Sequence, residues 1–510
     1  MGPGVWRLGT ILCLLLPPAA AAQLPPVGVP AGVFRFEVDG FFETWDEQYD
    51  GGEVEPFGAS LTASALGVAL LPSLADAESR IRTLAALPGF QLNLGDLSAD
   101  VQADRGFANI GGTLGITRGI AIFGRMPLVR SRVQGRLDLE GGNVGQNPGS
   151  SAQDPFFADF QTALGSLSDR IAAGTYDGDP ALRAAADAAL AEGSALRDGL
   201  FQLLSDATTA AAFVPTATSD AGQAINARVA ALQAQLTGPL GVVGFTSAPL
   251  FPSAATEDQL ELFIGDLSGP VGLRPGQSLV SFRGDAEAGV AVTLADRWDL
   301  QGGKGGFRAA VEGLVRFPTG RRARTDRLLA LGTGDGQTDL EVRSTVDVGS
   351  GNVGVRLEGG YNRQLAGDIV DRVAPPGQPF PGTDLLAELT LDPGDVVTVA
   401  ARPFFRIART IAIQATLEHS SRGEDDVSYR DAAGAVPGVD ASVLAEGTKA
   451  SVTVGGIGIT YSNLGGLRPG GRGLPVDAGW SYERVLRASG GFVPNTHRLR
   501  ARFRVYFGMF

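Results

Sequence analysis

Arginine side chains at alternate positions are the most concentrated chemistry in this sequence. Residues 497–510 read H-R-L-R-A-R-F-R-V-Y-F-G-M-F, with Arg498, Arg500, Arg502 and Arg504 separated by single residues. Because side chains of a β-strand alternate between two faces, these guanidinium groups share one face at a spacing of about 6.6–6.8 Å. Cations this close repel one another unless carboxylates lie beside them, so the pattern predicts an ion-pair network.

Side chains suited to catalysis or metal binding are scarce. The only histidines are His419 and His497, and the only cysteine is Cys13. Glu418 and His419 are adjacent, so on a strand they point to opposite faces and form no hydrolase-like pair. Zinc sites need clusters of His or Cys, and residues 302–306 lack the Ser/Thr and helix of a phosphate loop. We therefore predict no enzymatic activity, no cofactor and no metal site.

The N-terminus has the pattern of a secretory signal. Arg7 precedes the short apolar run Leu8–Leu16, and Ala20–Ala22 forms a cleavage site of the A-x-A type. The apolar run is too short to span a bilayer as a helix. We predict a signal peptide over 1–22, followed by a linker over 23–32.

Composition narrows the class of protein. The chain has 510 residues and a formal net charge of −13, an acidic balance that argues against nucleic acid as a partner. Hydrophobic residues make up 44% of the chain, too many for a disordered protein. Beyond the signal, no stretch approaches the roughly eighteen apolar residues of a membrane-spanning helix.

Alternating apolar and polar residues recur in segments that predict β-strands. They lie at approximately 33–45, 97–117, 119–138, 278–295, 305–318, 337–349, 352–364, 396–407, 410–421, 448–461, 474–486 and 496–510. Twelve strands are the preferred count, and fourteen is the alternative if 57–66 and 90–96 form an extra hairpin. Every second connection is short and rich in Gly or charge, whereas most of the others are long. This asymmetry is typical of an antiparallel transmembrane β-barrel with both termini in the periplasm.

Charged residues in these segments share one parity. Arg or Lys facing lipid costs about 2–4 kcal/mol at the bilayer midplane, so the charged parity should face the lumen. The predicted luminal charge network is Arg35, Glu37, Asp39, Arg308, Glu312, Arg316, Asp339, Glu341, Arg343, Arg402, Arg406, Asp477, Glu483, Arg498, Arg500, Arg502 and Arg504. Closure makes the first and last strands neighbours. We call Arg498, Arg500, Arg502 and Arg504 the arginine ladder, and we expect Glu37 and Asp39 on the first strand and Asp477 and Glu483 on the preceding strand to lie beside it. These charges either select permeating ions or merely pair and fill the lumen.

The long link between 138 and 278 has a different periodicity. Its Ala-rich segments predict helices over Phe156–Ala173, Pro180–Ser205 and Asp220–Leu236, the second capped by Asp179 and the third by Asp220. A further helix is predicted over Ser73–Leu87, capped by Ser73. We therefore describe 33–510 as a barrel with a helical insertion at about 139–277, which either caps the barrel from outside, the preferred alternative, or plugs it.

The C-terminal segment resembles the closing strand of a bacterial outer-membrane β-barrel. The resemblance implies location in the outer membrane, with outer-membrane lipid and the barrel assembly machinery as partners. It also implies that the terminal aromatic belongs to an assembly signal. The residues of that signal are Phe503, Val505, Phe507 and Phe510.

Three short motifs resemble the putative outer-membrane proteins of phenol meta-pathway clusters, loosely related to fatty-acid and aromatic-hydrocarbon channels. They are the hairpin sequence Gly115–Val129, the pair Phe317–Gly320 and Leu331–Gly334, and Gly284-Asp285 before a strand. The resemblance implies a channel for passive uptake of an unknown small molecule, possibly a hydrophobic one. The glycines have a plain alternative explanation as turn residues. The alternative function is a structural or surface-display barrel whose helical loop binds an external partner.

Overall fold

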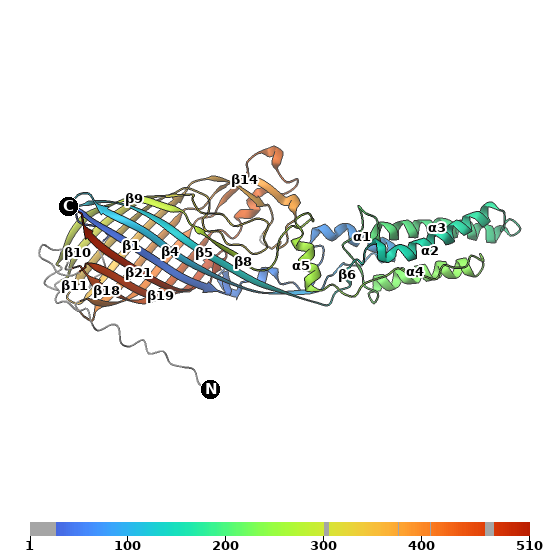
Figure 1. Cartoon of the computed structure of the whole chain (residues 1–510), viewed down its shortest axis with the longest axis horizontal. Helices are drawn as coiled ribbons and strands as arrows, with labels where there is room; N and C mark the ends of the chain where they lie inside the picture. Colours follow the sequence, from blue (N-terminus) through green and yellow to red (C-terminus); the bar gives the residue numbers. More distant parts are fainter. Residues whose placement is uncertain (1–26, 300–304, 376, 409, 465–473, 510) are drawn as a thin grey trace, which may run out of the picture.

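Twelve antiparallel strands close into a barrel that forms one end of the molecule (Figure 1). The computed structural model describes residues 27–299, 305–375, 377–408, 410–464 and 474–509. The barrel strands are β1 (Val33–Trp45), β4 (Asp96–Gly115), β5 (Ile120–Glu140), β9 (Ala286–Asp299), β10 (Gly305–Phe317), β11 (Asp339–Ser350), β12 (Val353–Gln364), β15 (Val396–Arg406), β16 (Ile411–Arg422), β18 (Ala450–Asn463), β19 (Val476–Gly490) and β21 (His497–Gly508). Each pairs with the next, and β21 pairs with β1 to close the sheet, so the predicted twelve-stranded barrel is confirmed.

The two faces of these strands differ as the alternation predicts. On β1, Glu37 is buried on the inner face, whereas Phe36 and Phe42 on the outer face are 37% and 50% exposed. Exposed apolar side chains continue around the outer wall, for example Leu357 and Leu417. A closed sheet satisfies its backbone groups internally, so with an apolar outer face it is a transmembrane barrel of the outer-membrane type. None of the helices in the described part of the chain is long and apolar enough to cross a membrane.

One predicted strand, 278–295, is divided in two by the structure. β8 (Ser278–Arg283) pairs only with the extracellular half of β5, and β9 pairs with the periplasmic half. Gly284 and Asp285 lie between them, and Gly284 donates its N–H to the carbonyl of Pro127 on β5 at 2.8 Å. Pro127 has no N–H to return, so regular pairing stops at this point. β8 is the additional strand of the sheet. The extra hairpin at 57–66 and 90–96 does not form barrel strands, so the alternative count of fourteen is wrong.

Short and long connections alternate around the barrel. The connections at 116–119, 351–352 and 407–410 are short and lie at the end where β1 begins and β21 ends, which is the periplasmic end. At the other end, the extracellular loops carry small sheets and turns. Their strands are β2 (Glu47–Asp50), β3 (Glu53–Pro56), β20 (Val493–Pro494), β13 (Gly367–Arg372), β14 (Leu386–Asp392) and β17 (Asp426–Tyr429). Their 3-10 turns are η1 (Ala59–Leu61), η2 (Pro72–Leu74), η3 (Thr383–Leu385), η4 (Ala432–Gly434) and η5 (Ala441–Ala445).

A helical head extends from the extracellular end along the long axis of the molecule (Figure 1). It contains α2 (Ser150–Ala172), α3 (Pro180–Leu204) and α4 (Asp220–Thr237), with α1 (Ala75–Ala85) and α5 (Glu257–Gly265) nearer the barrel. Strands β6 (Val144–Gln146) and β7 (Phe213–Pro215) pair at the base of the α2–α3 hairpin. Its apolar core is continuous with buried side chains at the extracellular ends of β4 and β5, such as Val101 and Val133, and within the head the rings of Phe160 and Phe245 stack at 4.5 Å. The head therefore lies outside the barrel.

The helix caps differ in part from the sequence predictions. Asp179 caps α3 by accepting the N–H groups of Ala181 and Leu182. The cap of α4 is Ser219, because its hydroxyl accepts the N–H of Gly222 and leaves Asp220 inside the helix. Ser73 caps nothing, since it lies in η2, which runs directly into α1. α2 begins at Ser150, six residues earlier than predicted, with Pro155 near its N-terminus. The helix α5 was missed, although Thr256 and Gln259 form a capping box at its start.

Candidate functional site: the barrel lumen

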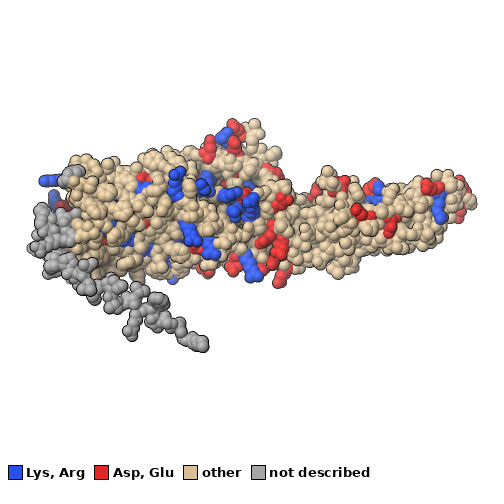
Figure 2. Space-filling model, in the orientation of Figure 1, with Lys and Arg blue, Asp and Glu red and all other residues tan. Residues whose placement is uncertain are grey.

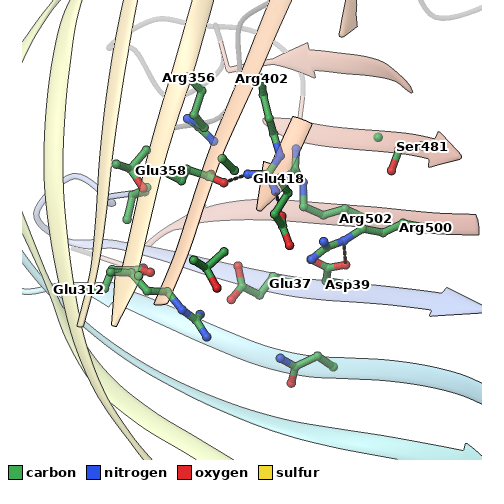
Figure 3. Close-up of a pocket in the computed structure, with 18 of the residues that line it drawn as sticks. Glu37, Asp39, Glu312, Arg356, Glu358, Arg402, Glu418, Ser481, Arg500 and Arg502 are labelled. Carbon is green, nitrogen blue, oxygen red and sulfur yellow. Dashed lines mark hydrogen bonds and ion pairs between the residues drawn. The ribbon is translucent and has the colours of Figure 1, made fainter. Parts of the chain in front are cut away.

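The barrel encloses a luminal cavity of about 480 Å³ lined mainly by charged side chains (Figure 3). Eight of the lining residues are arginines: Arg35, Arg125, Arg343, Arg356, Arg402, Arg500, Arg502 and Arg504. Eight are carboxylates: Glu37, Asp39, Glu287, Glu312, Glu341, Glu358, Glu418 and Glu483. The charges balance, and they come from strands all around the barrel because the inner parity of each strand carries them. The site is therefore a polar lattice without excess formal charge.

The arginine ladder of β21 meets carboxylates on both neighbouring strands. The nearest nitrogen–oxygen distances are 2.8 Å for Arg498–Glu43, 2.9 Å for Arg500–Asp39, 3.7 Å for Arg502–Asp477 and 3.1 Å for Arg504–Glu37. Glu483 lies 3.8 Å from Arg498. The register explains this, since Glu37 is opposite Arg504 and Asp39 is opposite Arg502. The four predicted carboxylates thus lie beside the ladder, together with Glu43, which sequence reasoning missed.

Glu37 is the most connected carboxylate of the lumen. It lies 2.7 Å from Arg125, 3.1 Å from Arg504 and 3.2 Å from Arg35. Arg125 reaches across from β5 and also approaches Glu287 at 3.6 Å and Glu312 at 3.9 Å. Sequence reasoning missed Arg125 because it considered that hairpin for its glycines and proline. Arg125 has the same parity on β5 as the buried Phe123 and Val129, and this parity indicates the inner face.

A second cluster lies toward the periplasmic end. Asp347 on β11 accepts hydrogen bonds from Arg308 at 2.8 Å and from Arg356 at 2.7 Å. The guanidinium of Arg308 also lies over the Trp298 ring, 5.0 Å from its centroid. Arg406 is buried near the same end but does not line the cavity. Arg356 was missed, although it shares the parity of the other inward residues of β12.

A third cluster lies toward the extracellular end. Arg316 contacts Glu287 at 3.1 Å, Glu341 at 3.2 Å and also Asp339. Glu341 in turn accepts a 2.6 Å hydrogen bond from Arg343. Three strands contribute to this cluster, so its members are far apart in sequence.

Arg402 on β15 joins carboxylates of its two neighbouring strands near the middle of the lumen. It contacts Glu358 on β12 and Glu418 on β16, the latter at 3.0 Å (Figure 3). The neighbour of Glu418, His419, points outward, where its Nδ1 lies 3.0 Å from the Thr453 hydroxyl. Glu418 and His419 are therefore on opposite faces. Within the described residues, no group of three or more His, Cys, Asp and Glu side chains is arranged to hold a metal ion.

The N-terminal segment closes much of the periplasmic end. The Val27 carbonyl accepts a 3.1 Å hydrogen bond from Arg35, and its side chain packs on the inward-facing Phe123 and Leu314. A second cavity of about 430 Å³ lies on the periplasmic side, and Val27 lines both cavities. The segment therefore separates two parts of the lumen.

A loop over 318–338 folds inward at the extracellular end. The hydroxyl of Ser131, on the inner face of β5, donates to the carbonyl of Gly332 at 3.3 Å. Asp285 holds the loop by accepting the N–H groups of Gly320 at 2.8 Å and Asp335 at 3.3 Å. A Cβ at Gly334 would meet the Asp285 carboxylate at 2.2 Å, so glycine is required there. The motifs Phe317–Gly320 and Leu331–Gly334 therefore contact Gly284-Asp285 in one structural site that holds the loop in place.

The predicted assembly residues lie partly within the described chain. Phe503 and Phe507 are 46% and 44% exposed on the outer face of β21, and Val505 is buried at the same parity. Phe510 and the signal peptide lie outside the described residues.

Comparison with protein-family models and with curated proteins gave no match. Solved structures gave matches. An outer-membrane channel from Pseudomonas putida F1 covers 95% of this chain and 100% of its own, with 10% identity and a TM-score of 0.43. The TodX monoaromatic hydrocarbon channel, as a deletion mutant, covers 94% and 91% with 10% identity and a TM-score of 0.29. The CymD monoaromatic hydrocarbon channel covers 94% and 89% with 8% identity and a TM-score of 0.27. The chain is thus similar to solved outer-membrane channels, at 10% identity or less.

Proposed function

We propose that this barrel is an outer-membrane channel through which small polar molecules pass without an energy source. The observation that carries the proposal is the enclosed cavity of about 480 Å³ with its charge-balanced lining. Ionised side chains on the wall can hydrogen-bond a polar solute or its water. An apolar solute would displace water from these side chains without replacing the lost hydrogen bonds. The lining therefore supports polar cargo over the hydrophobic cargo that the sequence resemblance implies.

The size of the cavity and its partial closure support small solutes. Its volume lies within the range of about 300–1,000 Å³ common for small-molecule sites. Val27 narrows the periplasmic end of the cavity, and the loop 318–338 folds inward at the extracellular end of the barrel, which favours small solutes over large ones.

Adjacent residues with opposite orientations provide a direct test. Ser481 lines the cavity, whereas its neighbour Tyr482 is 39% exposed on the outer face. We expect Ser481→Trp to lower single-channel conductance in planar bilayers several-fold, because the indole fills luminal space. Tyr482→Trp is the matched control and should leave conductance unchanged. Folding of each variant is checked by its heat-modifiable mobility on gels. Absence of conductance from the folded wild-type barrel would overturn the proposal.

The second candidate function is display of the helical head to an external partner. Exposed apolar side chains favour it, because Val243 and Leu262 are 76% and 70% exposed in the insertion. Lone exposed apolar residues are common on soluble surfaces, so this support is weaker. A conducting barrel that keeps its conductance after removal of the head would assign display and conduction to separate parts of the chain.

A further inference from the structure

An unneutralised group of arginines lies on the outer wall of the barrel, away from the lumen. Arg130 and Arg132 follow one another on the outer face of β5, and Arg283 lies on the outer face of the adjacent β8. Arg130 and Arg283 are exposed, and Arg132 is half-buried. Figure 2 shows Lys and Arg side chains gathered on the face where β5 and β8 lie in Figure 1.

The position of these arginines coincides with the edge of the lipid-facing band. The outer face of β5 is apolar or glycine from Ile120 to Leu128, with Ile122, Met126 and Leu128 exposed. The ten residue steps from Ile120 to Arg130 extend about 34 Å along a strand, or roughly 26 Å along the membrane normal at a tilt of about 40°. The apolar band of such barrels is about 25 Å tall, so Arg130 falls at its extracellular border.

The charges of this group are not cancelled by the barrel itself. No ion pair joins Arg130, Arg132 or Arg283 to a carboxylate among the residues that the structure describes. Arg130 is opposite Gly106 on β4 and Ser281 on β8, neither of which is charged. Arg132 is opposite Asp104 but beyond ion-pair distance, and its Nε is buried with no hydrogen-bond partner in the described chain.

An outward arginine on another side of the barrel shows the contrast. Arg363, at the extracellular end of β12, lies 3.1 Å from Asp395 and 3.4 Å from Asp392. Its charge is balanced by the protein and needs no external anion. The arginines on β5 and β8 have no such partners among the described residues.

The neighbouring loop holds the side chain of Arg283. The Nε of Arg283 donates to the Thr319 carbonyl at 3.2 Å, which fixes its direction. Arg321 on the same loop lies 3.7 Å above the ring of Phe282, which is on the inner face of β8 opposite Val129, so Arg321 is not part of the outer group. Arginine presents a planar fork of donors that matches phosphate oxygens in a bidentate manner.

We propose that Arg130, Arg132 and Arg283 bind the phosphate groups of anionic lipids in the outer leaflet. A headgroup phosphate lies at the height of Arg130, and its acyl chains extend along the apolar outer face below it. The site would hold the lipid by charge-assisted hydrogen bonds and by contact with side chains such as Leu128. This site is separate from the lumen and does not depend on the proposed channel function.

The test uses the full-length barrel in neutral detergent and a bis-phosphorylated glucosamine lipid as the probe. Bound lipid is counted by native mass spectrometry for the wild type and for Arg130→Gln/Arg132→Gln/Arg283→Gln. Since removal of three cations weakens attraction to a phosphorylated headgroup, we expect affinity to fall by about tenfold or more. The matched control is Arg183→Gln/Arg197→Gln/Arg228→Gln on the helical head, which should bind as the wild type does.

Two further arms separate the possible sources of binding. The dephosphorylated lipid should bind at least about tenfold more weakly, and high salt should weaken binding of the phosphorylated form. If the triple variant does not fold, Arg130→Gln alone serves, since no hydrogen bond or ion pair is described for Arg130. Equal binding by the variant, or equal binding of the dephosphorylated lipid, would overturn the proposal. Displacement by inorganic phosphate at equal concentration would instead indicate a free-anion site and also overturn it.

Discussion

At the residue scale, two neighbouring arginines of the ladder are paired unequally. Arg500 makes two hydrogen bonds to Asp39, at 2.9 and 3.0 Å, whereas the nearest carboxylate oxygen to Arg502 is 3.7 Å away. Both line the cavity. The charge of Arg500 is therefore mainly neutralised by Asp39, whereas Arg502 has more capacity to attract a permeating anion.

This difference predicts different results for Arg500→Gln and Arg502→Gln. Both remove a positive charge, so the reversal potential in a salt gradient should shift toward cation selectivity. Arg500→Gln should also destabilise the barrel by about 1–3 kcal/mol, because Asp39 loses its partner. Arg502→Gln should have little effect on stability. Unfolding in urea measures the second quantity, and unchanged reversal potentials in folded variants would leave the ladder a structural role alone.

Asp335, in the extracellular loop 318–338, predicts a pH effect. Burial raises the pKa of Asp335 above its ordinary 3.8, and the nearby Asp339 and Asp285 raise it further, against partial opposition from the Gln337 backbone N–H and from Arg316. The folded loop thus binds the proton more tightly than the unfolded loop does. Its stability from this group is greatest in acid and falls as pH rises from 3.8 through the raised pKa.

Hydrogen exchange of 318–338, corrected for intrinsic rates, should therefore show less protection at neutral pH than at about pH 4. Asp335→Asn should remove most of this dependence. Asp326→Asn is the control in the same loop, because Arg324 lowers the pKa of Asp326 and its contribution has the opposite sign. An unchanged pH profile in Asp335→Asn would contradict the assignment.

At the element scale, the described N-terminal segment lies between two cavities of the barrel. Removing Val27–Ala31 should join the cavities of about 480 and 430 Å³ and raise single-channel conductance. Deletion of Ala432–Val436, five residues in an extracellular turn, is the control of equal length. The prediction fails if both deletions leave conductance the same while the barrels remain folded.

The terminal strand β21 also carries a prediction about assembly. Phe503 and Phe507 point outward along β21, and Phe510 continues this end of the chain. Deleting Phe510 should reduce the amount of heat-modifiable barrel in the outer membrane, with Met509→Ala as the control. Undiminished yield after the deletion would argue against a role for the terminal aromatic in recognition by the assembly machinery.

At the scale of the whole molecule, the α2–α3 hairpin can be removed at a natural junction. Asn147 donates its N–H to the Ala212 carbonyl at 2.9 Å, so the ends of the hairpin are adjacent. Replacing 148–211 by a short Gly-Ser turn should leave barrel assembly and conductance unchanged, because luminal contacts come from strands and from the loop 318–338. Loss of conductance in a folded variant would show that the head takes part in permeation.

The sequence alone determined the parts of this protein that depend on local period. A period of two specified twelve strands and the inward parity of their charges, because a strand must place successive side chains on opposite faces. Closure then set Glu37 and Asp39 beside the arginine ladder. The helices α1 to α4 followed from their own period and, for α3, from the Asp179 cap, whereas α5 was missed.

The tertiary structure decided what depends on contacts between distant segments. The break between β8 and β9 required Pro127 on another strand, and the inward fold of 318–338 required Asp285 to accept its backbone N–H groups. Val27 obstructs the lumen because its carbonyl accepts a hydrogen bond from Arg35 and its side chain packs on Phe123. Arg125 contacts three carboxylates only because barrel closure brings β1, β9 and β10 near β5. None of these contacts has a periodic signal, since each is fixed by barrel closure and packing rather than by neighbours in the chain.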